Sequence, residues 1–239
     1  MALKGEVQEL IEACEQAGCP VCTLTGREMD RYFDHMLYMR VNEIELRADV
    51  RAAWGFCNRH ASMLIRPAGA LGTAIIYEDV LKNLLRALDG AQWEGGSRLR
   101  RRSGAEALVA RLEPAHECVG CAHQRETERA YVRALVKYLG NEVDVVPELA
   151  AAYGRSDALC WRHLRMALRR VRKPATFELL VAAQRAAWER LGAELAEFIR
   201  KNDYRFTHEK MGPEGDSWQR VVRQVAGASG LGGEEDRSL

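Results

Sequence analysis

The chain has 239 residues, of which 47% are hydrophobic and 29% charged, and only 6 are prolines. This is the composition of an ordinary soluble globular protein with room for a sizeable core. The 35 basic and 34 acidic residues nearly cancel, and a net charge of +1 argues against binding to nucleic acid or to an anionic membrane through overall charge.

The first residues, MALKGEVQELIEACEQAGC, mix charged and apolar residues and lack the uninterrupted apolar core of a signal peptide. No stretch approaches the roughly 20 apolar residues of a membrane-spanning helix. We therefore expect a cytoplasmic protein with no membrane partner. Because cytoplasmic thiols stay reduced, an organised cysteine pattern there indicates metal binding or catalysis rather than disulfides.

Six of the seven cysteines fall into motifs that occur twice in the same order. In each copy a Cys-x-x-Cys precedes a Cys-x-x-His, with 34 residues between the motifs in the first copy and 38 in the second. When the first copy is moved forward by 99 residues, Tyr32 coincides with Tyr131, and AAWG at 52–55 coincides with AAYG at 151–154. The sequence therefore contains an internal duplication, with Cys14 left over.

The elements expected in chain order are helical, because runs with the period of two that strands require are nearly absent. Residues 23–40 and 43–53 are predicted to form the two arms of a hairpin, and Trp54–Cys57 an extended return to the first motif. After each Cys-x-x-His, an apolar stripe predicts a long amphipathic helix. The stripe residues are Leu71, Ile75, Val80, Leu81, Leu84, Leu85 and Leu88 in the first copy, and Phe177, Leu180, Val181, Gln184, Ala187, Trp188, Leu191, Leu195 and Phe198 in the second.

These signals predict an all-α fold of two tandem repeats, each a metal-clasped helical hairpin followed by a long packing helix. The first repeat is expected at 1–92 and the second at 114–202. Between them, 93–113 is a basic, glycine-rich linker. At the end, 203–239 is expected to form a C-terminal arm with a short helix and a disordered tail.

Three thiolates and one imidazole form the closed ligand set of a structural zinc site. A Cys-x-x-Cys at a helix start directs both sulfurs to one point, and helical spacing places the Cys and the His of Cys-x-x-His on one face. If each hairpin closes, the two motifs of one copy share an ion. We therefore expect one site from Cys19, Cys22, Cys57 and His60, and a second from Cys118, Cys121, Cys160 and His163. A thioredoxin-like thiol pair at 19–22 is disfavoured, because no βαβ pattern surrounds it.

Zinc at two sites is the first expectation, and two [4Fe–4S] clusters, each held by three cysteines and a histidine, are the alternative. A closed site leaves no position for substrate, and the sequence has no phosphate loop, HExxH motif or nucleophile elbow, so no catalytic residue is predicted. The expected function is that of a non-catalytic, zinc-stabilised adaptor, accessory or regulatory protein with an unidentified protein partner. The alternatives are an iron–sulfur electron-transfer or redox-sensing protein, and a nucleic-acid-binding zinc protein that uses the basic segments at 98–102 and 169–173.

The duplicated Cys-x-x-Cys … Gly-Phe-Cys-x-x-His pattern, followed by NDYRFTHEKMGPEGDSW at 202–218, resembles a bacterial and archaeal family catalogued as a domain of unknown function. The resemblance covers the chain from about residue 10 to about residue 226. It implies the same eight metal ligands and brings no activity with it. The second copy departs from the pattern, because Ala158 and Leu159 replace Gly-Phe before its cysteine.

Overall fold

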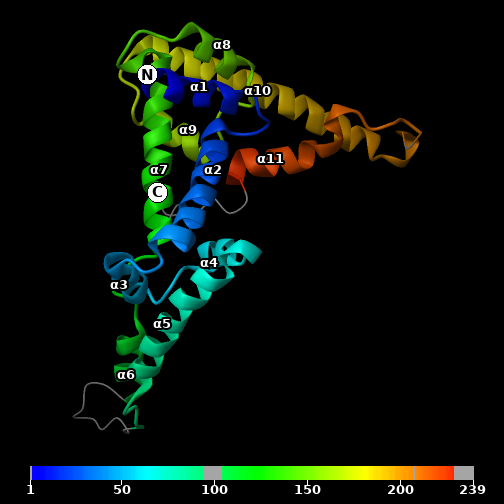
Figure 1. Ribbon diagram of the computed structural model, residues 1–239. Coiled ribbons are helices and arrows are strands. Elements are labelled where there is room, and N and C mark those ends of the chain that lie inside the picture. Colours follow the sequence, from blue (N-terminus) through cyan, green and yellow to red (C-terminus); the bar gives the residue numbers. More distant parts are fainter. Residues whose placement is uncertain (1, 94–103, 207, 229–239) are drawn as a thin grey trace, which may run out of the picture. The chain divides into compact units, whose positions relative to one another are not determined.

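The computed structural model describes residues 2–93, 104–206 and 208–228, and these residues form eleven α-helices and no strand (Figure 1). The predicted all-α class is therefore confirmed for this part of the chain. The chain divides into two compact units: unit 1 comprises Met1–Glu28 and Arg125–Leu239, and unit 2 comprises Met29–Gln124. None of the helices in the described ranges is long and apolar enough to cross a membrane.

Unit 1 begins with α1 (Ala2–Cys14) and the first part of α2 (Pro20–His35), and resumes with the last part of α7 (Val119–Val136). The elements that follow are η3 (Lys137–Asn141), α8 (Pro147–Arg155), α9 (Trp161–Leu168), α10 (Pro174–Lys201), η4 (Tyr204–Phe206), η5 (Pro213–Asp216) and α11 (Ser217–Ala226). Helix α8 packs on α1 and α10, and α11 packs on α9 and α10 (Figure 1). The core between these helices contains fully buried side chains such as Leu135, Leu149 and Leu180.

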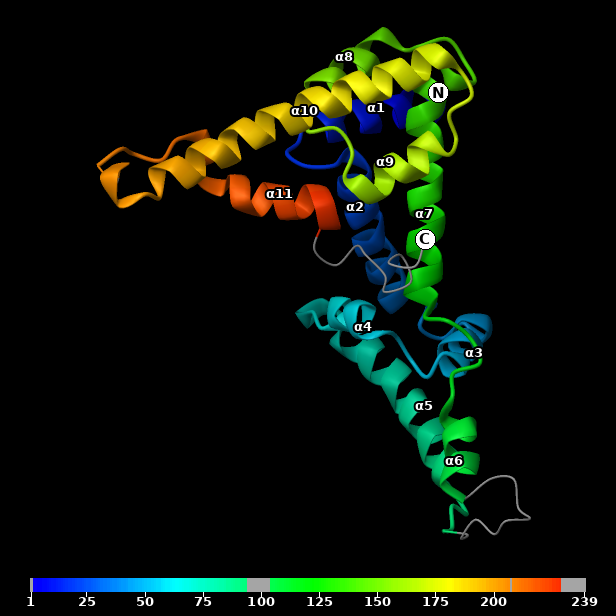
Figure 2. The same cartoon turned by 180° about the vertical axis from the view of Figure 1, so that it is seen from behind.

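Unit 2 contains the rest of α2 and the start of α7. Its other elements are η1 (Met36–Arg40), α3 (Ile44–Ala52), α4 (Asn58–Leu64), η2 (Pro67–Gly69), α5 (Ala70–Leu88) and α6 (Gly104–Leu112). Helix α5 packs on η1 and α3, and α6 lies beside α5 (Figure 2). Phe33, Met36 and Leu64 form part of its buried core.

The hairpin predicted to return Cys57 to the first motif does not form, because the two motifs of the first copy lie in different compact units. The segment expected to be extended instead turns, because Trp54 and Gly55 have φ angles of 53° and 98°. Residues 19–22 belong to unit 1, and residues 57–60 belong to unit 2.

The two long packing helices are present as α5 and α10, and the predicted stripe fits α10 better than α5. In α10, Leu180, Gln184 and Leu191 are buried as predicted, but Phe177 and Trp188 are exposed. In α5 the buried residues are Gly72, Ile76 and Val80, whereas most of the predicted leucines are exposed: Leu71, Leu81, Leu85 and Leu88. The close approach of α5 to η1 selects this face, because a Cβ atom on Gly72 would lie 2.6 Å from the carbonyl oxygen of Leu37.

Candidate metal centres

All eight predicted ligands lie in two groups of four, and within each group the ligand atoms are within 4.8 Å of one another. Group 1, in unit 1, consists of Cys19, Cys22, Cys160 and His163; group 2, in unit 2, consists of Cys57, His60, Cys118 and Cys121. Each group therefore combines the Cys-x-x-Cys of one copy with the Cys-x-x-His of the other. The predicted pairing within each copy is wrong: Cys57 and His60 lie in unit 2, whereas Cys19 and Cys22 lie in unit 1.

Each group is assembled where two helices begin. In group 1, Cys19 directly precedes α2 and Cys160 is the N-cap residue of α9. In group 2, Cys118 directly precedes α7 and Cys57 is the N-cap residue of α4. The N-terminal end of a helix carries partial positive charge, which favours a thiolate over a neutral thiol. Two such ends at each group suit it to a cation bound by several thiolates.

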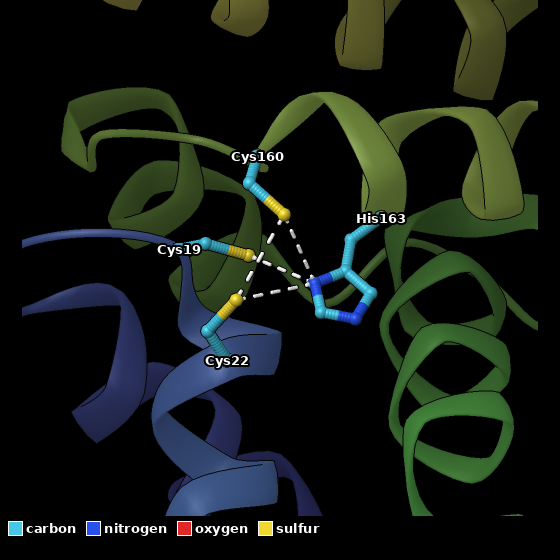
Figure 3. A group of neighbouring side chains, drawn as sticks. All are labelled: Cys19, Cys22, Cys160 and His163. Atoms are coloured by element: carbon cyan, nitrogen blue, oxygen red, sulfur yellow. Dashed lines mark hydrogen bonds between the residues drawn. The ribbon is translucent and has the colours of Figure 1, made fainter. Parts of the chain in front are cut away.

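In group 1, three sulfur atoms and one imidazole nitrogen point toward a common centre (Figure 3). The Sγ atoms of Cys22 and Cys160 are 3.8 Å apart. The Nδ1 atom of His163 lies 3.4 Å from the Sγ atoms of Cys19 and Cys22, and 3.2 Å from that of Cys160. A tetrahedral zinc ion would hold its sulfurs roughly 3.8 Å apart and each sulfur roughly 3.5 Å from the nitrogen. The donor atoms therefore fit a single ion.

Group 2 has the same arrangement. The Sγ atoms of Cys57 and Cys121 are 3.6 Å apart. The Nδ1 atom of His60 lies 3.2 Å from the Sγ of Cys57, 3.6 Å from that of Cys118 and 3.4 Å from that of Cys121. The two groups differ in exposure: all four residues of group 1 are buried, whereas the three cysteines of group 2 are only half-buried.

The outer nitrogen of each histidine faces a polar side chain of α7. His60 Nε2 lies 3.1 Å from Gln124 Oε1, and His163 Nε2 lies 3.8 Å from a carboxylate oxygen of Glu128. Glu128 is fully buried and accepts two hydrogen bonds from Arg162, of 3.0 and 2.7 Å. When Nδ1 binds a metal, Nε2 carries the proton, and an acceptor at Nε2 fixes that tautomer and the orientation of the ring.

These supporting residues were not predicted from the sequence. One signal was present: an arginine directly precedes the histidine in both Cys-x-x-His motifs, as Arg59 and Arg162. Gln124 and Glu128 carry no such signal, because the duplicated positions in the first copy are Thr25 and Met29.

Gly120 is required by the close approach of His60. A Cβ atom at this position would lie 2.7 Å from Cγ and 3.0 Å from Nδ1 of the imidazole. Gly120 lies between Cys118 and Cys121, so a larger residue here would displace the histidine from the ligand atoms. The corresponding residue between Cys19 and Cys22 is Val21, which is fully buried, so this constraint applies to group 2.

The backbone just before Cys160 is held in place by the buried side chain of Gln184. The side chain of Gln184 accepts a hydrogen bond from the Leu159 N–H at 3.1 Å and donates one to the Leu159 carbonyl at 3.0 Å. Just before it, Ala158 has a φ angle of 55°, a left-handed conformation that costs a non-glycine residue about 1 kcal/mol or more. The strained turn at Ala158 and the two hydrogen bonds of Gln184 together orient Cys160, the N-cap residue of α9.

Burial changes the protonation of the ligands in group 2. It raises the pKa of Cys121 to about 12 and raises that of Cys118, and it lowers the pKa of His60 to about 4. At neutral pH the metal-free group therefore has a neutral imidazole, which is the form that binds a metal, and protonated thiols at Cys118 and Cys121. A bound metal would displace those thiol protons.

In group 1 the pKa values of Cys160 and His163 are shifted in opposite directions. Hydrogen bonds from Cys19, Cys22 and His163 lower the pKa of Cys160. Burial disfavours the charged form of His163, but its hydrogen bonds to Cys160, Cys22 and Glu128 outweigh burial and raise its pKa. The metal-free group thus favours a thiolate–imidazolium pair. Cys14 is buried outside both groups, and burial raises its pKa to about 12.

The fold and these groups define an all-α protein with two Cys₃His groups, each of which can hold a metal ion. The chain belongs to the family of unknown function DUF6062, whose model matches residues 6–230. It is 28% identical over 219 residues to an "uncharacterized 23.9 kDa protein in xynA 3′ region" of Caldicellulosiruptor sp. (strain Rt8B.4), covering 91% of this chain and 99% of that protein. No solved structure matches the chain. The predicted membership of an uncharacterised family is confirmed.

Proposed function

We propose that this protein is a non-catalytic, zinc-stabilised helical protein in which both Cys₃His groups are structural metal sites. The observation that carries the proposal is the compactness of each group, whose four ligand atoms all lie within 4.8 Å of one another. A [4Fe–4S] cluster places four irons and four sulfides between its ligands, which spreads the cysteine sulfurs farther apart than a single ion does. The observed spacing favours one ion over a cluster.

The donor set supports zinc and a structural role. Three thiolates and an imidazole are a common ligand set for zinc, and four protein ligands complete its tetrahedron without an open position for substrate or water. The buried Glu128 and Gln124 side chains fix the histidines, as expected for a site that holds its geometry. Reduced cysteines, which such sites need, are consistent with the cytoplasmic location that we propose.

The proposed role as an adaptor or accessory protein is supported by apolar side chains on unit 1. Trp161, Trp188 and Val225 are all more than two-fifths exposed. They line a hollow of about 400 Å³ at α9, α10 and α11, together with Leu191, Gly192, Leu195, Val221 and Gln224. Exposed apolar surface of this kind is typical of protein interaction sites.

The metal is tested by purifying the protein without air and measuring zinc, iron and acid-labile sulfide. We expect colourless protein with about two zinc ions per chain, one for each four-ligand group. Replacement by Co²⁺ should give the intense visible bands of tetrahedral cobalt–thiolate sites. Brown protein that contains iron and sulfide would refute the zinc proposal in favour of the iron–sulfur alternative.

The interaction role is tested by affinity capture from an extract of the source cells. We expect a specific partner that the wild type retains and the Trp188→Ser variant loses. Trp93→Ser is the matched control, because Trp93 is 80% exposed and belongs to unit 2. Equal capture by all three proteins would contradict a role for the apolar hollow.

A further inference from the structure

Four arginines surround a second surface hollow of unit 1, with a volume of about 420 Å³. Arg129 belongs to α7, and Arg169, Arg170 and Arg172 follow the last residue of α9. The other lining residues are Met166 and Glu142. Positive charges therefore exceed negative charges by three around one small space.

Within the described ranges, none of these four guanidinium groups forms an ion pair or a side-chain hydrogen bond. Other arginines of unit 1 are paired: Arg200 contacts Glu197 and Glu209, and Arg220 contacts Asp216. The negative end of the α9 dipole attracts the arginines that follow it, but this attraction extends only over the last helical turn. It does not account for Arg129, which comes from another helix.

The turn that carries three of the arginines is fixed by a buried side chain. Asn141 is 5% exposed; its amide nitrogen donates to the Arg170 carbonyl at 3.2 Å, and its amide oxygen accepts the Arg172 N–H at 2.7 Å. The arginines are thus presented on an ordered backbone beside α7. The four side chains are exposed, so solvent screens their mutual repulsion, and an anion with several charges would contact more than one of them.

The lining indicates the class of anion. The planar guanidinium fork matches the oxygens of phosphate and forms paired hydrogen bonds with them. No lining residue is aromatic, so the hollow offers no surface on which a nucleic-acid base could stack. Its volume suits a small molecule. We propose that this hollow binds a small compound carrying two or more linked phosphate groups, independently of the metal sites.

The proposal is tested by calorimetric titration of the full-length, metal-loaded protein with inorganic tripolyphosphate at low ionic strength. We expect saturable binding of one tripolyphosphate per chain. Arg129→Gln and Arg170→Gln should each weaken binding roughly tenfold or more, the usual effect of losing a charged hydrogen bond. Arg185→Gln is the matched control, because Arg185 is an exposed arginine of α10 outside the hollow, and it should leave binding unchanged.

Glu142→Gln gives a test that misfolding cannot imitate, since removal of the rim carboxylate should tighten binding several-fold. Metal content measured after each titration should stay constant, which shows that tripolyphosphate does not act by extracting the ions. Absence of saturable binding, or equal weakening by Arg185→Gln, would overturn the proposal. So would tighter binding of a mixed-sequence RNA oligomer that the Arg129 and Arg170 variants abolish, because that result would identify a nucleic-acid surface instead.

Discussion

Cys22 and Cys160 are separated by 138 positions in the chain, and their Sγ atoms lie 3.8 Å apart. The two residues come from different copies of the duplicated motif, so an ion in group 1 would connect the first helices of the chain to its C-terminal half. Cys57 and Cys121 form the equivalent link in group 2. Each ion would thus close a long loop and exclude many unfolded conformations.

The cross-copy pairing is tested by double variants. Cys19→Ser with Cys160→Ser removes two ligands of one group, so the protein should keep one ion. Cys19→Ser with Cys57→Ser damages both groups and should leave none, because a structural site needs all four ligands. Metal analysis of the purified variants distinguishes the two results.

Pairing within each copy predicts the opposite ion counts: none in the Cys19→Ser, Cys160→Ser variant and one in the Cys19→Ser, Cys57→Ser variant. Cys14→Ser is the matched control: Cys14 is buried but belongs to neither group, and its variant should retain both ions.

The eight candidate ligands could be predicted from the sequence, whereas their grouping could not. Motif spacing identifies eight donors because a helix start aligns residues at i and i+3 locally. Pairing depends on the tertiary fold, including the turn at Trp54, whose positive φ angle nothing in the sequence indicates. Likewise, the α5 stripe has two apolar faces, and only the approach of Leu37 to Gly72 decides which one is buried.

The domain boundaries expected from the duplication follow the sequence copies, whereas the compact units do not. Unit 2 takes its ligands from both copies, since Cys57 and Cys118 meet inside it. The arginines expected at 98–102 and the tail expected at 229–239 lie outside the described residues.

In the C-terminal arm, Glu214 is 5% exposed and pairs with Lys201 at 2.6 Å.

Gly120→Ala should impair group 2 and spare group 1. The added Cβ would lie 2.7 Å from His60 Cγ, so the imidazole must move away from the three sulfurs. We expect loss of one ion and a lower melting temperature. Gly192→Ala is the control: nothing lies within 4 Å of its Cβ in α10, and the helix should gain up to about 1 kcal/mol. Retention of both ions by Gly120→Ala would show that His60 is not a ligand in this geometry.

Glu128→Ala should destabilise unit 1 by about 3–5 kcal/mol, because it removes the buried carboxylate that accepts two hydrogen bonds from the largely buried Arg162 guanidinium. It should also weaken metal binding at group 1 by about 10–100-fold through the loss of its contact with His163. The affinity is measured by competition with a chelator in the Cys57→Ser background, where group 2 is disabled. Glu126→Ala, an exposed change on the same helix, should alter neither quantity.

The two ions should leave in a fixed order when the protein is treated with a strong chelator. The cysteines of group 2 are half-buried, whereas those of group 1 are buried, so chelator reaches group 2 first. Native mass spectrometry should show an intermediate with one ion. Alkylation of that intermediate should modify Cys57, Cys118 and Cys121 before Cys19 and Cys22. Simultaneous loss of both ions would contradict this order.

Metal affinity at group 2 should rise steeply with pH. Burial raises the pKa of Cys121 to about 12 and also raises that of Cys118, so at neutral pH a metal must displace at least these two protons. Below these pKa values the apparent affinity should therefore increase by roughly a hundredfold or more per pH unit.

His60 makes the stability of the metal-free fold depend on pH as well. Its pKa is lowered to about 4, chiefly by burial, while an unfolded histidine titrates near 6.5. The neutral ring therefore stabilises the fold above about pH 6.5, and this contribution is lost as the pH falls toward 4. Zinc release followed with a chromophoric indicator from pH 8 to pH 4 in the Cys19→Ser background measures group 2 alone. Release that does not depend on pH would show that the thiols of group 2 are not the ligands.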